Sequence, residues 1–210
     1  MFTTSEEDIR NTRKESRKEV RDRIKMQRRG MSRDDAVEKS GEIAEKLFGS
    51  QDFRDASTMA FYAEKHDDRD VCTEEMIKRS MRMQKTIALP VTYKAERRLR
   101  FFKIENYSEL HAPPKNFYIP EPIPSEKNMI AESDFDLVIV PGIAFNLNGY
   151  RLGWGFGFYD DFLSRVSREA KRIGLAYELQ IADFPVESHD IPVDRIITEK
   201  RIVECKYFRK

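Results

Sequence analysis

The hexapeptide Phe-Asp-Leu-Val-Ile-Val at residues 135–140 most restricts the folds open to this chain. Its last four residues are all apolar, so a strand there would present apolar side chains on both of its faces. Strands of this kind lie inside parallel sheets whose two faces are covered by helices. The run therefore predicts the centre of an α/β sheet.

Apolar patterns along the rest of the chain alternate between the two-residue period of strands and the 3.6-residue period of helices. Helices are expected over residues 5–29, 32–48 and 73–83, and from the glycine-rich segment to about residue 171. Strands are expected over residues 58–63, 86–93, 98–104, 135–140, 173–177 and 195–203. Because strands alternate with helices, the fold class is predicted to be α/β, a three-layer α/β/α single domain with a mostly parallel mixed sheet.

Length and charge limit the organisation of the chain. Its 210 residues fit one large domain or at most two small ones, and we expect a single domain, residues 1–210, with a basic N-terminal helix (residues 1–30) packed on it. Ser5 is expected to cap that helix and Gly30 to end it. The formal net charge is +1, so global charge argues neither for nor against a nucleic-acid partner.

Two further features bear on the compartment. Cys72 and Cys205 have neither a metal-ligand spacing nor the density of a disulfide scaffold, which predicts reduced thiols in a cytoplasmic protein. No apolar run approaches the roughly 20 residues that a membrane span needs. The first eight residues also lack the apolar core of a signal peptide. We therefore expect a cytoplasmic protein with no membrane partner.

The densest chemical pattern is the segment Arg-Leu-Gly-Trp-Gly-Phe-Gly-Phe-Tyr-Asp at residues 151–160. It follows the expected 135–140 strand and precedes a helix, at the carboxyl edge of the sheet where α/β proteins bind ligands. Glycines let the backbone approach a phosphate and offer it successive N–H groups. The spacing matches neither the P-loop nor the dinucleotide fingerprint. A tight turn before a helix explains the glycines alone equally well.

Two neighbours of the glycines favour a phosphate site over a plain turn. Arg151 can fork onto phosphate oxygens, and Asp160 can offer oxygen to Mg²⁺. The intervening aromatics Trp154, Phe156 and Phe158 could stack on a flat heterocycle, although ordinary core packing also accounts for them.

Longer motifs around this segment resemble one enzyme family. Residues 141–163 read Pro-Gly-Ile-Ala-Phe-x-x-x-Gly-x-Arg-Leu-Gly-x-Gly-x-Gly-x-Tyr-Asp-x-Phe-Leu. Matching segments follow at residues 174–180, 185–190, 193–194 and 198–199, and the basic first helix, Leu89-Pro90 and Glu121-Pro122 extend the likeness over nearly the whole chain. The sequence thus resembles the 5-formyltetrahydrofolate cyclo-ligases, also called 5,10-methenyltetrahydrofolate synthetases.

The resemblance implies a fold and a reaction. The fold would be similar to the NagB/RpiA/CoA-transferase-like fold. The reaction would convert 5-formyltetrahydrofolate to 5,10-methenyltetrahydrofolate with ATP as co-substrate and Mg²⁺ as cofactor, releasing ADP and phosphate through an N5-iminophosphate intermediate. The partners would be ATP and a reduced folate, with no nucleic acid, and the protein would be a monomer.

The resemblance also assigns roles to residues. It implies a catalytic role for Arg151 and Tyr159 and Mg²⁺ binding by Asp160 and Asp190. It implies ATP binding by Arg13, Lys14, Arg17, Arg151, Leu152, Gly153, Trp154, Gly155, Phe156, Gly157, Phe158 and Tyr159. It implies folate binding by Tyr62, Asp70, Trp154, Gly155, Phe156, Gly157 and Phe158.

The same residues have plainer interpretations without the resemblance. Arg13 and Arg17 are spaced i,i+4 on one helical face, and a solvated basic face would explain them. Asp190 alone would be a turn carboxylate, and His189 is interpreted as structural.

The sequence departs from the family's pattern at several positions. Asn146 stands where an aspartate is usual, Asp161 where an arginine often follows Tyr-Asp, and Phe158 where a tyrosine is common. Asp70 stands for the glutamate that contacts folate, and Cys72 shows that its segment has drifted. The ATP half of the site is therefore better supported than the folate half.

Two other functions remain open at this point. The same ATP and Mg²⁺ site could serve another formylated or acylated small molecule, or a modified pterin. A non-catalytic member could instead use the basic first helix to bind nucleic acid, although no aromatic RNA-reading motif accompanies the basic residues.

Overall fold

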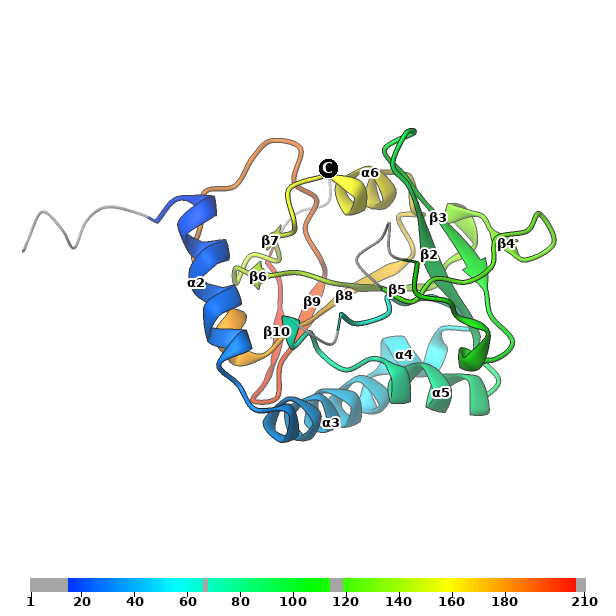
Figure 1. The fold of residues 1–210 in the computed structure, drawn as a ribbon, viewed down its shortest axis with the longest axis horizontal. Helices are drawn as coiled ribbons and strands as arrows, with labels where there is room; N and C mark the ends of the chain where they lie inside the picture. Colours follow the sequence, from blue (N-terminus) through cyan, green and yellow to red (C-terminus); the bar gives the residue numbers. More distant parts are fainter. Residues whose placement is uncertain (1–14, 66–67, 114–118, 207–210) are drawn as a thin grey trace, which may run out of the picture.

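The computed structural model describes residues 15–65, 68–113 and 119–206 (Figure 1). Within these residues a central sheet has the strand order β10-β9-β8-β5-β1-β2-β3-β4. Its strands are β1 (Thr58–Ala60), β2 (Thr86–Tyr93), β3 (Arg98–Lys103), β4 (Met129–Ile130), β5 (Leu137–Val140), β8 (Lys171–Leu175), β9 (Arg195–Ile197) and β10 (Ile202–Glu204). A separate short pair contains β6 (Ala144–Phe145) and β7 (Arg151–Leu152).

The sheet is parallel in its centre and antiparallel at its edges. The neighbouring strands β2, β1, β5, β8 and β9 pair in parallel. The strands β3 and β4 extend one edge antiparallel, and β10 extends the other. This confirms the prediction of a mostly parallel mixed sheet, with the 135–140 run at its centre.

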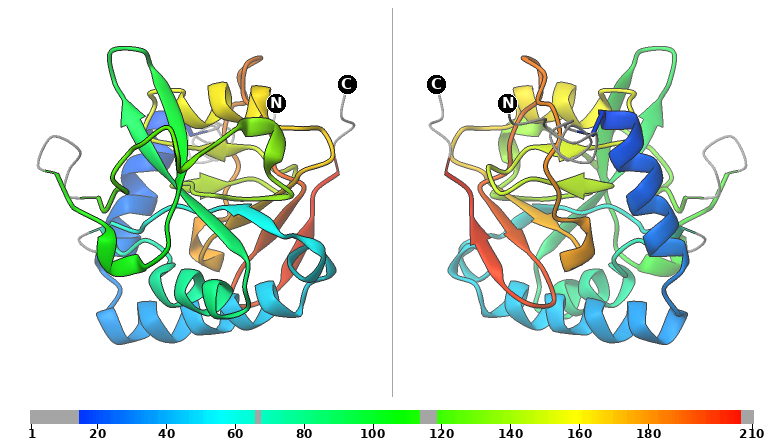
Figure 2. Two further views of the ribbon diagram at one scale, coloured as in Figure 1. Left: turned by 90° about the vertical axis from the view of Figure 1, so that its right-hand side faces the viewer. Right: turned by 90° about the vertical axis from the view of Figure 1, so that its left-hand side faces the viewer.

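Helices cover both faces of the sheet, as Figures 1 and 2 show. On one face lie α3 (Arg33–Gly49), α4 (Gln51–Asp55) and α5 (Glu74–Arg82), and on the other lies α6 (Phe158–Arg165). The remaining long helix, α2 (Arg17–Arg29), lies beside β6 at one end of the sheet. The described residues contain no helix that is both long enough and apolar enough to cross a membrane.

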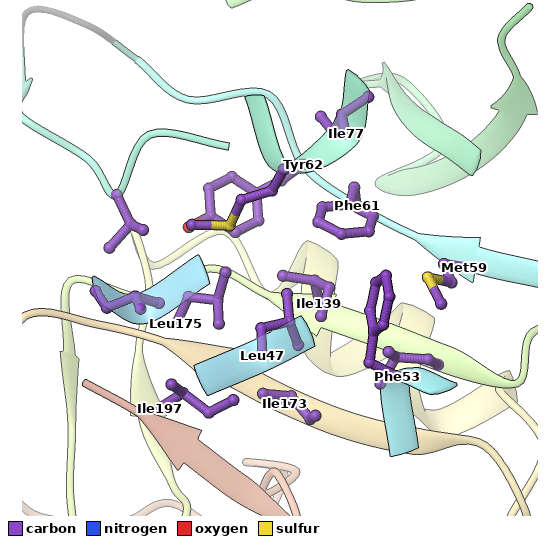
Figure 3. Packing of buried hydrophobic residues seen from close by; sticks show 14 of the residues in the cluster. Leu47, Phe53, Met59, Phe61, Tyr62, Ile77, Ile139, Ile173, Leu175 and Ile197 are labelled. Atoms are coloured by element: carbon purple, nitrogen blue, oxygen red, sulfur yellow. The ribbon is translucent and has the colours of Figure 1, made fainter. Parts of the chain in front are cut away.

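The apolar residues of β5 fill two cores at once. Ile139 belongs to the cluster under α3 and α4, with Leu47, Phe53, Ile173 and Tyr62 (Figure 3). Val138 and Val140 belong to the cluster under α6, with Phe162 and Leu163. Successive strand residues point to opposite faces, so a strand that is covered on both sides must be apolar at every position.

The start of the first helix differs from the prediction. Ser5 lies outside the described residues, and residues 15 and 16 are not helical. The helix α2 begins at Arg17 because Ser16 and Glu19 form a capping box: the Ser16 hydroxyl accepts from Glu19 N (3.3 Å), and Ser16 N donates to the Glu19 carboxylate (2.7 Å). A single helix over residues 5–29 is therefore wrong at its start. Its end at Gly30 is confirmed.

Two elements near the C-terminus also differ. The helix predicted to reach about residue 171 ends at Arg165, and residues 171–175 are already strand β8. The strand predicted over 195–203 is a hairpin of β9 and β10. Thr198 causes that turn, since its buried hydroxyl accepts from Lys200 N (3.2 Å) and Arg201 N (3.0 Å) and donates to Glu178 (2.7 Å). The single-domain prediction for residues 1–210 stays a prediction.

Truncation of the central strand tests the two-sided core. Ile139→Ala is expected to lower the free energy of unfolding by about 2–5 kcal/mol, because it leaves a cavity that the packed helices cannot fill. Ile202→Ala, at an edge-strand residue that is 44% exposed, is expected to change the free energy of unfolding by at most about 0.5 kcal/mol. Urea denaturation of both variants measures the difference, and equal losses would contradict this account of the core.

Candidate active site

One face of α2 carries four basic side chains, Arg17, Arg21, Lys25 and Arg28. Their spacings of four, four and three residues place them in one row along the helix. The neighbouring apolar face, Val20 and Ile24, packs in a small core with Ile143, Ala144, Leu152 and Phe184. This packing fixes α2 against the β6–β7 pair, so the basic row faces the loops at this end of the sheet. We call these four residues the basic row.

Arg17, the first member of the basic row, forms a two-pronged ion pair with Asp190. Its Nη1 lies 2.5 Å from Oδ2 and its Nη2 lies 3.1 Å from Oδ1. Burial of Asp190 opposes ionisation, but hydrogen bonds from Arg17 and from the backbone N–H of Glu187 outweigh it, so the pKa of Asp190 lies below its ordinary value. Asp190 is therefore a fixed negative charge facing α2.

A second ion pair lies directly beside the first. Arg151, buried on β7, donates from Nη2 to Oδ1 of Asp160 (3.0 Å) and from Nη1 to the carbonyl of Ile191 (2.7 Å). The backbone N–H of Ile191 donates to the same Asp160 oxygen (3.1 Å). Since Asp190 and Ile191 are consecutive, the two ion pairs meet on one loop. The structure therefore brings together Arg17, Arg151, Asp160 and Asp190.

The glycine segment ends at the N-terminus of α6. Gly155 (φ +96°) and Gly157 (φ +74°) have left-handed backbone conformations, which side chains other than glycine strongly disfavour. Gly157 is the N-cap of α6, and no side chain caps the first turn. Uncapped N–H groups at a helix N-terminus attract anions. The loop therefore presents a backbone suited to phosphate next to the two ion pairs.

The basic row also contacts the glycine segment directly. Arg21 Nε donates to the carbonyl of Gly153 (2.8 Å), and Lys25 Nζ lies 3.8 Å from the centre of the Trp154 ring. Burial lowers the pKa of Lys25 and of Arg21 from their ordinary values. Trp154 and Phe156 are exposed, which leaves their rings available to a ligand.

Tyr159 has a buried hydroxyl that makes no hydrogen bond to the described residues. Burial raises the pKa of Tyr159 above its ordinary value, although the charge of Arg151 acts in the opposite direction. The hydroxyl thus remains a donor near neutral pH. A buried donor without an acceptor is uncommon and calls for an explanation, and a ligand oxygen would supply the missing acceptor.

The residues expected on the folate side lie on the segment after β1. Tyr62 is buried in the main core (Figure 3). Burial raises its pKa well above the ordinary value, and Asp70, Tyr177, Glu64 and Tyr159 add to this. Asp70 pairs with Arg28, the last member of the basic row, at 2.6 Å. Lys65 Nζ lies 5.3 Å from the Trp154 ring centre, which places this segment beside the glycine segment.

The carboxylates offer oxygen ligands of the kind that Mg²⁺ prefers. Among the described residues, no donor contacts Oδ2 of Asp160, so this oxygen is available to a cation. Ligand atoms of Glu187, His189 and Asp190 lie within 4.8 Å of one another. These oxygen and imidazole donors suit a divalent cation, and Asp160 lies outside the cluster of three. Binding at Asp190 would require Arg17 to share or release that carboxylate.

Several residues of this site were missed by the sequence analysis. Arg21, Lys25 and Arg28 follow Arg17 at spacings of four, four and three residues, so the pattern was present in the sequence. Glu187 joins the site through its contact with Arg17 (Nε to Oε1, 3.6 Å), which no local pattern indicates. Arg13 and Lys14 lie outside the described residues, and their roles stay predictions.

The departures from the family pattern have local structural accounts. Asn146 accepts from Asn148 N and Tyr150 N (both 3.1 Å), a turn role that an aspartate oxygen would serve equally. Asp161 pairs with Arg165 on the exposed side of α6, which balances its charge. Phe158 packs against the core under α6. Burial raises the pKa of Cys72, so this position offers a neutral thiol.

Comparison with known proteins places the chain among one group of enzymes. A model of the 5-formyltetrahydrofolate cyclo-ligase family matches residues 13–199. A 5-formyltetrahydrofolate cyclo-ligase of Mycoplasma pneumoniae is 36% identical over 78 residues, which cover 37% of this chain and about half (48%) of that relative. The 5-formyltetrahydrofolate cyclo-ligase of Escherichia coli K12 is 28% identical over 184 residues, covering 86% of this chain and 99% of the relative.

A solved structure shares the fold over nearly the whole chain. The solution structure of Aquifex aeolicus 5,10-methenyltetrahydrofolate synthetase matches with a TM-score of 0.78 at 27% identity. The match covers 92% of this chain and 95% of that one. The predicted fold class is thereby confirmed.

The ion pair of Asp190 predicts a pH-dependent stability. Because its pKa is lowered in the folded protein, ionised Asp190 stabilises the fold above the ordinary aspartate pKa of about 3.9. That contribution is lost as the pH falls through the lowered pKa. Asp190→Asn is expected to cost about 1 kcal/mol at pH 7, after allowance for solvent screening, and much less in strong acid.

Urea denaturation between strong acid and pH 7 measures the difference in the free energy of unfolding between wild type and Asp190→Asn. Asp161→Asn is the control, because Asp161 is exposed and pairs only with another surface side chain. A gap for Asp190→Asn that stays constant with pH would contradict the assignment of the charge.

Proposed function

This chain belongs to the 5-formyltetrahydrofolate cyclo-ligase family, and we propose that it converts 5-formyltetrahydrofolate to 5,10-methenyltetrahydrofolate, using ATP and Mg²⁺. ADP and phosphate are the other products. The observation that carries the proposal is the meeting of two arginine–carboxylate pairs on residues 190–191, beside the uncapped N-terminus of α6. Cations, carboxylates and free N–H groups are the parts from which phosphoryl-transfer sites are built.

The reaction needs two ligands aligned and negative charge held, with no covalent protein nucleophile. The formyl oxygen attacks the γ-phosphorus, the bond to ADP breaks, and an iminophosphate forms at N5. N10 then attacks the former formyl carbon, the ring closes and phosphate leaves. Such chemistry depends on positioning and on electrostatic stabilisation.

The triphosphate would lie along the glycine segment. The N–H groups at the start of α6 would donate to phosphate oxygens. Arg151 would reach the same oxygens and is already oriented by the Ile191 carbonyl and by Asp160. Arg17 and Arg21 would add positive charge from α2, together with Arg13 and Lys14 if their predicted roles hold.

Asp160 and Asp190 would hold Mg²⁺, and Asp160 would offer Oδ2, since the donors that contact this carboxylate among the described residues use Oδ1. When bound, the ion neutralises charge on the phosphate oxygens. Glu187 and His189 lie close enough to Asp190 to assist. The earlier interpretation of His189 as structural therefore competes with a role beside the metal.

The folate would lie between the glycine segment and the segment after β1. Trp154, Phe156 and Phe158 would form one wall, and Tyr62 and Asp70 the other. The unpartnered hydroxyl of Tyr159 would donate to an oxygen of the reacting group, because it has no acceptor among the described residues and the centre of its ring lies 5.9 Å from Cζ of Arg151.

In this proposal the basic first helix would add positive charge to the triphosphate site, whereas in a nucleic-acid module it would bind nucleic acid. The residues of the basic row each contact another part of the protein, and none of the four is fully exposed: Arg17, Arg21, Lys25 and Arg28. A nucleic-acid surface needs exposed cations.

We also propose that the protein is a cytoplasmic monomer. Gel filtration with light scattering tests the oligomeric state.

The direct test mixes protein, 5-formyltetrahydrofolate and Mg²⁺-ATP and follows the near-ultraviolet absorbance of the methenyl product. Absorbance is expected to rise only with all components present. No rise, with nucleotide bound, would contradict the assigned acceptor and favour another acylated compound or a modified pterin.

A pair of adjacent variants tests the metal and phosphate site. Asp160→Asn is expected to lower turnover about 100-fold or more, because it removes a charge that orients Arg151 and faces the metal. Asp161→Asn changes the next residue, which pairs with Arg165 on the surface, and is expected to leave turnover within about twofold. Near-normal turnover of Asp160→Asn would contradict the site assignment.

A further inference from the structure

Arg28, at the end of the basic row, is buried to an unusual degree for an arginine. Only 2% of it is exposed, and it ranks among the largest fully buried side chains of the described residues. Its Nη1 pairs with Oδ1 of Asp70 at 2.6 Å, while its Nε is buried without a hydrogen-bond partner among those residues. Removing a guanidinium from water is costly, and an apolar side chain of similar volume often stabilises a fold as well or better. Stability alone is thus a weak reason for this residue.

The partner of Arg28 is held from several sides. Oδ1 of Asp70 forms an ion pair with Nη1 of Arg28 (2.6 Å), Oδ2 accepts from the backbone N–H of Lys65 (3.2 Å), and the main-chain carbonyl accepts from the Tyr177 hydroxyl (3.0 Å). These contacts fix both the position and the rotation of the carboxylate. Its side chain nevertheless remains 23% exposed.

Asp70 also keeps the capacity to bind a ligand. A carboxylate has about four lone-pair sites, and the protein donors named above use about one on each oxygen. About two sites therefore remain, one on each oxygen, for donors that approach from the exposed side. Two neighbouring N–H groups on a flat ring match two carboxylate oxygens.

The next residue on α2 forms a contrasting pair. Arg29 donates to Asp68 (2.7 Å), but here the arginine is 59% exposed and the carboxylate is 2% exposed. Lys65 Nζ also contacts Asp68, at 3.0 Å. Asp68 is therefore enclosed by protein cations and attaches its segment to α2. Of the two aspartates that Arg28 and Arg29 hold, Asp70 is the one whose side chain remains partly exposed.

We propose that Arg28 is a positioning residue that orients Asp70 to accept a pair of N–H groups from the flat heterocycle of the substrate. The ligand class is a ring with adjacent ring N–H and amino donors, such as the aminopyrimidinone edge of a pterin. The inference rests on the proposed function, because it takes Asp70 to lie on the folate side. The shorter Asp70 serves in place of the family's glutamate because Arg28 sets its orientation.

Steady-state kinetics of Arg28→Met test the proposal. Methionine keeps an apolar stem but leaves Asp70 unoriented. The KM for 5-formyltetrahydrofolate is expected to rise about 10- to 100-fold, as for loss of a hydrogen-bonded charged contact, and the KM for ATP to stay within about twofold. Arg28→Lys is expected to restore part of the loss. Arg29→Met, the matched control, is expected to leave both KM values within about twofold, because Asp68 keeps its ion pair with Lys65.

A double variant separates positioning from a general effect on the fold. If Arg28 acts through Asp70, Arg28→Met combined with Asp70→Asn is no worse for folate KM than Asp70→Asn alone. Equal increases in both KM values for Arg28→Met, or no change in either, would overturn the proposal. Thermal melts check that each variant folds. If Arg28→Met does not fold, Arg28→Lys decides: a rise confined to folate KM supports the proposal, and unchanged folate KM overturns it.

Direct binding distinguishes failure of this inference from failure of the proposed reaction. Trp154 is the single tryptophan of the chain, so its fluorescence reports ligands at the glycine segment. Titration with 5-formyltetrahydrofolate, corrected for ligand absorbance, gives Kd without turnover. If wild type binds 5-formyltetrahydrofolate without turnover, and Arg28→Met binds it more weakly than wild type does, the positioning role is supported and the proposed reaction is rejected. Turnover in wild type with unchanged folate Kd in Arg28→Met rejects the positioning role alone, and no folate binding by wild type rejects both.

Discussion

The site depends on one interaction, the docking of the basic row of α2 on segments from three distant parts of the chain. Arg17 reaches residue 190, Arg21 and Lys25 reach the glycine segment, and Arg28 reaches Asp70. These target segments are mostly loops, which lack the repeated hydrogen bonds that fix helices and strands. A helix presents side chains at fixed intervals, so one helix can hold the three loops in register. The apolar face of α2 anchors the arrangement to the β6–β7 pair.

Each charge at the junction of the two ion pairs already has a partner of opposite sign. Binding of a triphosphate with its cation would exchange these partners: arginines would turn to phosphate and carboxylates to the metal. Charges that are held in place before a ligand arrives need little reorganisation during the reaction. The long arginine side chains likewise lose their conformational entropy during folding. Less of the favourable contact energy is then offset when the ligand binds.

The sequence predicted those parts of the structure that local patterns determine. The run at 135–140 predicted the centre of the sheet, because its last four residues are all apolar and fit a strand covered on both faces. The glycine segment predicted an anion site before a helix, and the structure has an uncapped N-terminus there. Element ends were less predictable. The capping box at Ser16 and the Thr198 turn depend on side-chain hydrogen bonds that compete with continuation of the helix or strand.

Local sequence patterns did not predict which side chains pair between distant parts of the chain. The spacing of Arg17, Arg21, Lys25 and Arg28 could identify a basic face, but only the fold determines that it faces inward. Asp70 and Arg28 lie 42 positions apart in the sequence, so neither residue alone indicated the pair. The motif match predicts where ligands bind, and the structure adds which side chains hold the motif residues in place.

Hydrogen exchange in the variant Arg17→Met, Arg21→Met, Lys25→Met tests the central role of the basic row most directly. The account predicts faster exchange of backbone N–H groups in residues 153–159 and 185–191, with exchange in β5 unchanged, because these loops lose their attachments while the core stays intact. Unchanged exchange in both loops would contradict the account, since the loops would then hold their positions without α2.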